Sequence, residues 1–191
     1  MQTFVFDCFG VISSEVAPLV LEAHLPAKTV RVVKDTIIMD ADRGVISQSV
    51  MFEKLAGVLC LPADQIEEEF WSRVHIDPDV VDIIKTLRVA HRIGFLSNSP
   101  APFVREILAR HALADLFQTI VISAEEGLVK PDPAIFTRLL GKMAVPPADA
   151  VMIDDKQRNI EGARSAGMHG LVFESAEKLV LDLAELFAIR L

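Results

Sequence analysis

The chain has 191 residues, of which 51% are hydrophobic and 24% are charged, a composition typical of a globular protein rather than a disordered one. Its formal net charge of −8 argues against a nucleic-acid partner, because binding nucleic acid requires a clustered positive surface. No apolar run approaches the ~20 residues that a membrane span needs, and the first ten residues lack the basic segment of a signal peptide.

The first predicted element is a buried strand over Thr3–Phe6, a short run of β-forming residues. The segment from residue 14 to 77 differs, because it contains amphipathic helical stretches and no convincing strand. These stretches are Pro18–His24, Thr29–Met39, Ser47–Leu59 and Ala63–Val74. Ser47 has the side chain and the position of a helix N-cap. We therefore expect residues 14–77 to form a small helical domain inserted after the first strand.

The rest of the chain, residues 78–191, alternates between helical and strand patterns. The predicted helices are Val80–Val89, Pro102–His111, Pro133–Met143 and Asn159–Ala166. The predicted strands are Ile93–Leu96, Thr119–Ile122, Val151–Ile153 and Leu171–Phe173. Such alternation predicts an α/β fold with a parallel sheet that is covered on both faces. Residues 1–13 and 78–191 would together form this core domain.

Polar residues follow three of the predicted strands. Asp7 ends the first, Ser97 and Asn98 end the second, and Asp154 and Asp155 end the fourth. Ligands of open parallel sheets bind outside the carboxyl ends of the strands. The sequence therefore predicts a site that joins these side chains at one edge of the sheet.

The chemistry of this predicted site points to a metal. Carboxylates on neighbouring strands repel each other unless a cation lies between them, and hard oxygen ligands suit Mg²⁺. Lys130, in a loop after the third predicted strand, could add a positive charge. If the ligand is a phosphate, the metal and such local cations must hold it against the negative charge of the chain. No histidine pair has metal-ligand spacing.

Four runs resemble, in order, the motifs of the haloacid dehalogenase (HAD) superfamily: FDCFGVI, LSNS, GLVKPDPAIF and IDDKQRNIEGA. The resemblance covers nearly the whole chain and implies a three-layer Rossmann-like core. The helical insert lies where this superfamily has its small α-helical cap. The run DRGVIS within the insert, and the tail of the fourth motif, look most like the short-cap bacterial sugar-phosphate phosphatases of the superfamily.

The resemblance implies a Mg²⁺-dependent phosphatase that acts on a small phosphorylated metabolite. Asp7 would be the nucleophile and form an aspartyl-phosphate, with Lys130 as the second catalytic residue. Ser97 and Asn98 would bind the substrate phosphate, and Arg43 is a candidate for substrate contact from the cap.

The same resemblance assigns the metal ligands. They would be Asp7, the backbone carbonyl of Phe9, Asp155 and the adjacent Asp154. Asn159 would support the metal or Lys130, or simply cap a helix. Asp40 and Asp42 are read as a helix end and its turn rather than as a second acidic site.

Phe9 departs from the phosphatase pattern, which has a second Asp two positions after the nucleophile. That Asp protonates the leaving group, and Phe9 cannot. An aromatic residue here is similar to the metal-independent 2-haloacid dehalogenases, and a weakly active or non-catalytic ligand-binding protein is a further alternative. Whether Ser13, Ser14 or a substrate hydroxyl replaces the acid stays open.

The cellular setting is expected to be the cytoplasm. Cys8 and Cys60, the two cysteines, are far apart and suit reduced thiols. The expected partner is a small phosphate ester, with no nucleic acid and no membrane, and the sequence carries no sign of the oligomeric state.

Overall fold

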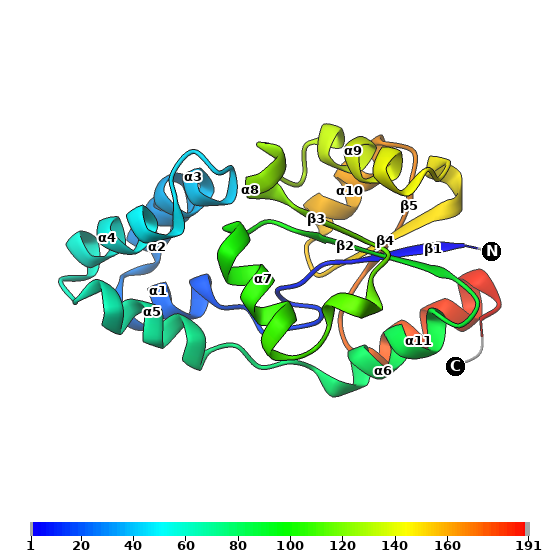
Figure 1. Ribbon diagram of the computed structural model, residues 1–191, viewed down its shortest axis with the longest axis horizontal. Coiled ribbons are helices and arrows are strands. Elements are labelled where there is room, and N and C mark those ends of the chain that lie inside the picture. Colours follow the sequence, from blue (N-terminus) through cyan, green and yellow to red (C-terminus); the bar gives the residue numbers. More distant parts are fainter. Residues whose placement is uncertain (1, 190–191) are drawn as a thin grey trace.

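The computed structural model describes residues 2–189, and these contain a sheet of five parallel strands. The strands are β1 (Thr3–Phe6), β2 (Arg92–Ser97), β3 (Thr119–Ile122), β4 (Ala150–Asp154) and β5 (His169–Val172). Their order across the sheet is β3–β2–β1–β4–β5, so β1 lies in the centre (Figure 1). The α/β class with a parallel sheet is confirmed.

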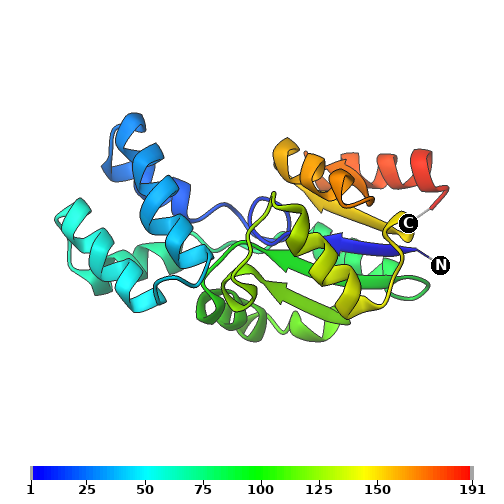
Figure 2. The same ribbon diagram turned by 90° about the horizontal axis from the view of Figure 1, so that it is seen from above.

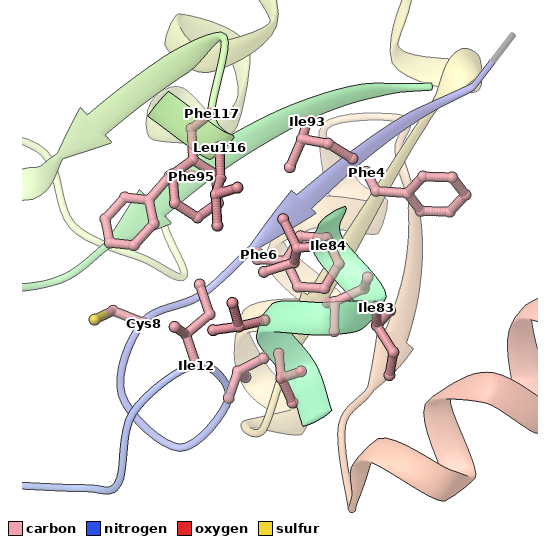
Figure 3. Packing of buried hydrophobic residues seen from close by; sticks show 14 of the residues in the cluster. Phe4, Phe6, Cys8, Ile12, Ile83, Ile84, Ile93, Phe95, Leu116 and Phe117 are labelled. Carbon is pink, nitrogen blue, oxygen red and sulfur yellow. The ribbon is translucent and has the colours of Figure 1, made fainter. Parts of the chain in front are cut away.

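Helices cover both faces of the sheet and give three layers. One face packs against α6 (Pro78–Leu87), α7 (Ala101–Arg110) and α11 (Ala176–Phe187), and the other against α9 (Pro133–Met143) and α10 (Gln157–Ser165). Side chains of a strand alternate between the faces, so Phe4 and Phe6 pack on the first group and Val5 on the second. Figure 3 shows Phe6 beside Ile84 of α6. Burial on both faces explains why the strands read as unbroken apolar runs.

The inserted helices lie together at the end of the molecule away from the chain termini (Figures 1 and 2). They are α1 (Ala17–His24), α2 (Ala27–Val33), a π-helical turn (Lys34–Ile38), α3 (Met39–Asp42), α4 (Gln48–Leu59) and α5 (Ala63–Ser72). We call these helices the cap. They enclose a hydrophobic cluster of their own, around Leu55 and Ile66, which also takes in Phe103 and Ile107 of α7. The cap therefore rests on α7 of the core.

The chain enters and leaves the cap through two segments that run side by side. The Ser14 N–H donates to the His75 carbonyl at 2.9 Å, and the Asp77 N–H donates to the Ile12 carbonyl at 2.9 Å. Asp77 then caps α6, because its side chain accepts from the Asp79 N–H at 2.9 Å. These hydrogen bonds tie the two crossings to each other and fix where the core resumes.

The structure contains elements that have no predicted counterpart, and one strand begins earlier than predicted. Helix α11 and the short helix α8 (Ser123–Glu126) had no predicted counterpart, and single 3₁₀ turns occupy Ala114–Leu116 and Pro147–Asp149. Strand β5 begins at His169, two residues before the predicted start. Within residues 2–189, no helix combines the length and the apolarity that crossing a membrane would require.

Candidate active site

Asp7 lies at the carboxyl end of the central strand and is 4% exposed. Its backbone continues the sheet, since its N–H donates to the Ile153 carbonyl at 3.0 Å. One carboxylate oxygen, Oδ1, accepts from the Cys8 N–H at 2.6 Å, and the other lies 2.8 Å from Lys130 Nζ. Burial raises the pKa of Asp7 to about 8, and the nearby Lys130 opposes that rise. The carboxylate therefore depends on cations for its charged form.

Lys130 supplies a buried positive charge between two carboxylates. Its side chain is 1% exposed, and Nζ lies 2.6 Å from Asp154 Oδ2 and donates to the Leu96 carbonyl at 3.1 Å. Burial would lower the pKa of Lys130, but Asp7 and Asp154 raise it above the ordinary value. Asn98 holds the backbone of Lys130, because its side chain accepts from the Lys130 N–H at 2.8 Å and donates to the carbonyl at 2.9 Å.

Both carboxylate oxygens of Asp154 accept hydrogen bonds from protein donors. Asn159 Nδ2 donates to Oδ1 at 2.8 Å and to Oδ2 at 3.0 Å, and the Lys156 N–H donates to Oδ1 at 2.9 Å. Burial raises the pKa of Asp154, but Lys130 outweighs this effect and the net shift is downward. Asp154 is therefore an ionised anchor for Lys130.

The third carboxylate, Asp155, completes an acidic cluster that fits a divalent cation. One oxygen from each of Asp7, Asp154 and Asp155 lies within 4.8 Å of the others. Asp155 Oδ1 is buried and has no hydrogen-bond partner among the described residues, and burial raises the pKa of this carboxyl. Gly10 leaves room for Asp155, since a Cβ there would lie 2.6 Å from Asp155 Cγ. Closely spaced carboxylate oxygens with a free acceptor suit Mg²⁺.

A cavity of about 440 Å³ opens from these residues into the cap. The core contributes Asp7 and Phe9, and the ring of Phe9 stacks on Phe103 with the ring centres 6.1 Å apart. The cap side contributes both apolar and charged residues. The apolar ones are Val16, Ala17, Pro18, Ala27, Val30, Ile38, Met39, Met51 and Phe70. A small ligand with a charged end and an organic body would suit this arrangement.

The predicted site residues fall into three places. The cavity lining includes Asp7, Phe9, Asn98, Lys130 and Asn159. Three others are not part of that lining: Asp154 and Ser97 are fully buried, and Asp155 is half-buried. Ser97 Oγ, at the end of β2, has no hydrogen-bond partner among the described residues. Arg43 is exposed and lies outside the lining, whereas its neighbour Asp42 belongs to it.

Several charged residues of the cavity were not singled out as site residues. They are Glu15, Arg31, Lys34, Asp35, Asp42, Lys156 and Arg158. Lys156 Nζ lies 2.6 Å from Glu15 Oε1, which joins the loop after β4 to the entry of the cap. Lys156 and Arg158 belong to the fourth motif, and Asp42 belongs to the run DRGVIS. The sequence signals were therefore present in the motifs, but they did not identify the residues that face inward.

Comparison with known proteins decides the family. The model of the haloacid dehalogenase-like hydrolases matches residues 1–167. The chain belongs to this HAD-like hydrolase family. A phosphoglycolate phosphatase from Vibrio vulnificus is 26% identical over 187 residues, which cover 87% of the chain and 81% of that relative.

Solved structures of HAD-like proteins share the fold. A HAD-like family hydrolase from Porphyromonas gingivalis gives a TM-score of 0.82 at 21% identity, covering 100% of this chain and 99% of that chain. A HAD family enzyme from Bacteroides thetaiotaomicron, in complex with magnesium and inorganic phosphate, gives 0.77 at 19% identity, covering 94% and 98%. The three-layer α/β fold is thus common to this chain and these structures.

Proposed function

We propose that this HAD-like hydrolase is a Mg²⁺-dependent phosphatase that cleaves a small phosphate monoester through an aspartyl-phosphate on Asp7. The observation that carries the proposal is the contact of Asp7 with Lys130 beside the acidic cluster, at the floor of a cavity. The similarity to a phosphoglycolate phosphatase and to an enzyme that binds magnesium and phosphate supports the same reaction class. The organic part of the substrate would occupy the cap side of the cavity.

In the proposed reaction each residue near Asp7 has a separate task. Asp7 attacks phosphorus, and Lys130 neutralises charge on the transferring phosphoryl group. Asn98 fixes the Lys130 backbone, and Ser97 would donate its free hydroxyl to a phosphoryl oxygen. Asp154 keeps Lys130 in place.

The residues that would hold Mg²⁺ are Asp7, Asp155 and the backbone carbonyl of Phe9. Asp155 Oδ1 accepts no hydrogen bond from any described residue and lies 3.8 Å from Lys156 Nζ, whereas both oxygens of Asp154 already accept hydrogen bonds. When bound, the metal supplies positive charge to the phosphoryl oxygens and lowers the repulsion between the carboxylates.

The metal-independent dehalogenase alternative fits this site less well. Its nucleophile would have to ionise beside Asp154 and Asp155, with Lys130 as the only buried amine in contact with Asp7 among the described residues. Two like charges that share a site raise the pKa of one carboxyl strongly. A divalent cation removes this conflict, so the donor set favours the phosphatase.

The test is phosphate release from a panel of sugar phosphates, 2-phosphoglycolate and 4-nitrophenyl phosphate, with Mg²⁺ and with EDTA. Wild type should release phosphate in the presence of Mg²⁺ and stop with EDTA, and Asp7→Asn should release none. Asp149→Asn is the matched control, because Asp149 is exposed and outside the cavity. Release that persists in Asp7→Asn would disprove the covalent route. Failure to release phosphate from any ester would rule out the proposed phosphatase activity, and 2-haloacids should then be tried as substrates.

A further inference from the structure

Phe9 leaves the proposed reaction without an acid on the loop after β1. Its ring lines the cavity and stacks on Phe103, so it shields the nucleophile but carries no proton. A positioned general acid is typically worth about 10²–10⁴ in rate. Another group that faces the same cavity would therefore have a large effect on the cleavage of poor leaving groups.

Four carboxylates line the cavity: Asp7, Glu15, Asp35 and Asp42. Asp7 is the nucleophile, and Glu15 is engaged with Lys156 at 2.6 Å. Asp35 is exposed and lies 3.8 Å from Arg31 on the same helical segment. Asp42 is half-buried, and its carboxylate has neither an ion pair nor a hydrogen bond to any described residue. It is the cavity acid that remains free to exchange a proton.

The two serines near the cap entry are less suited to this task. Ser14 Oγ donates to the Arg73 carbonyl at 2.5 Å and accepts from the His75 N–H at 3.0 Å. Ser13 is 2% exposed. Neither serine belongs to the cavity lining.

The backbone at Asp42 is fixed to the core although the residue belongs to the cap. Ser123 Oγ, at the start of α8, donates to the Asp42 carbonyl at 2.5 Å. Gly44 has a φ of +71° and approaches α8 so closely that a Cβ would lie 2.4 Å from the Ala124 carbonyl oxygen. This docking holds the end of α3 beside the site while the Asp42 side chain faces the cavity.

The surroundings of Asp42 suit proton transfer near neutral pH. Burial raises its pKa to about 7. Lys156 and Lys130 from the core, and Lys34 from the cap, oppose this rise, while Glu15 adds to it. A general acid works best when its pKa lies near the operating pH.

The direction of attack places the leaving group on the same side as Asp42. The attacking and leaving oxygens of a phosphoryl transfer are roughly in line with phosphorus. An ester attacked by Asp7 from the core thus directs its leaving oxygen towards the cap. We propose that Asp42 is the general acid and base of this site. This inference deepens the proposed phosphatase function and rests on it.

Asp42 gives up a proton in the first step of the reaction and regains one in the second. In the first, an Asp7 oxygen bonds to phosphorus, the ester P–O bond breaks, and the Asp42 carboxyl gives its proton to the departing oxygen, which leaves as an alcohol. In the second, water attacks the aspartyl-phosphate while Asp42 takes one of its protons. The bond between phosphorus and Asp7 then breaks, which releases hydrogen phosphate and restores both carboxyl groups.

The experiment compares Asp42→Asn with wild type on aryl phosphates of one size but different leaving groups, in the presence of Mg²⁺. Phenyl phosphate and 4-methoxyphenyl phosphate need a proton on the leaving oxygen, whereas 4-nitrophenyl phosphate leaves readily without one. We expect kcat/KM, which reports only the first phosphoryl transfer, to fall by about 10²–10⁴-fold for the first two esters and by less than about threefold for 4-nitrophenyl phosphate. Asp40→Asn, on the same helix but outside the cavity, should resemble wild type.

The outcomes separate this inference from the proposed function. Equal losses of kcat/KM on all three esters would assign Asp42 to binding or positioning and overturn the acid role. Unchanged kcat/KM on all three would overturn it as well. If the wild type cleaves none of the three esters, with or without Mg²⁺, the proposed phosphatase function itself would be overturned. Activity of Asp42→Asn on 4-nitrophenyl phosphate also shows that the variant is folded.

Discussion

Lys130 balances the charge of two buried carboxylates, and this gives it a structural role beside the catalytic role that we propose. Its Nζ lies 2.8 Å from Asp7 and 2.6 Å from Asp154, and all three side chains are nearly inaccessible to solvent. Removing one partner of a buried ion pair leaves the other charge without compensation, which costs far more than losing an exposed pair. The two roles can be separated by measuring stability apart from turnover.

We expect Lys130→Met to abolish phosphate release and to lower the free energy of unfolding by about 3–5 kcal/mol. The deficit should shrink as the pH falls, because burial already raises the pKa of Asp7 to about 8 in wild type. A carboxyl whose folded pKa lies above its unfolded value binds protons on folding, so its penalty is relieved below that pKa. Urea denaturation between pH 5 and 9 measures both effects.

The control for this prediction is Lys85→Met, because Lys85 pairs with Asp82 at the surface, where the two side chains are 56% and 72% exposed. Exposed pairs contribute about 0–1 kcal/mol. A deficit for Lys130→Met that is no larger than that of Lys85→Met, or that does not depend on pH, would contradict the buried-charge account.

At the scale of elements, the cap and the core meet through Ser123 at the junction of β3 and α8. Its hydroxyl donates to the Asp42 carbonyl in the cap and accepts from the Ser99 N–H of the loop after β2 at 3.0 Å. Ser123 and Ser99 are both buried. One hydroxyl therefore joins the end of α3 to the loop that presents Asn98 to the cavity.

We expect Ser123→Ala to cost about 1–3 kcal/mol of stability, since the buried Ser99 N–H loses its acceptor. It should also lower kcat and raise KM together, because the end of α3 is then free to shift relative to Asp7. Steady-state kinetics and urea denaturation give the two readouts. In Ser165→Ala the lost hydroxyl bonds only within α10, to the Glu161 carbonyl, so this control should stay within about 0.5 kcal/mol. A stability loss without any change in kcat or KM would show that the junction does not position the cap.

The elements differ in how far local sequence determines them. Strand β1 was predictable because Thr3–Phe6 is buried on both faces and ends in a carboxylate. Helix α11 was missed although its signal was local: Ser175 caps it by accepting from the Lys178 N–H at 3.2 Å, and apolar residues recur along one face.

Local sequence does not determine whether Asp42 or Arg43 faces the cavity, because adjacent residues of a helix point about 100° apart. Which of them faces the cavity depends on the docking of α3 against Ser123, 81 residues away in the chain. Gly44 takes part in the same docking. A contact of this separation leaves no periodic trace in the sequence. The motifs that carry the proposed catalytic residues were therefore visible in the sequence, but the inward-facing cap residues were not.

At the scale of the whole molecule, we expect the acidic cluster to couple metal binding to folding. The chain carries a formal net charge of −8, and Asp7, Asp154 and Asp155 concentrate part of that charge at the carboxyl ends of the neighbouring strands β1 and β4. The unfolded chain has no such cluster, so Mg²⁺ would bind the folded state preferentially. At 100 times its dissociation constant, a ligand of this kind adds about 2.7 kcal/mol to stability.

We expect Mg²⁺ to raise the Tm of wild type by roughly 5–10 °C at that concentration, since 1 kcal/mol shifts a domain of this size by about 2–4 °C. NaCl of equal ionic strength, which screens the net charge without filling the site, should give a much smaller shift. Gly10→Ala should lose most of the Mg²⁺ effect, because its new Cβ would lie 2.6 Å from Asp155 Oδ2 and displace that ligand. Gly57→Ala is the matched control, since nothing lies within 4 Å of a Cβ there. Equal Mg²⁺ shifts in the two glycine variants would mean that the ion stabilises the protein from somewhere other than the Asp155 cluster.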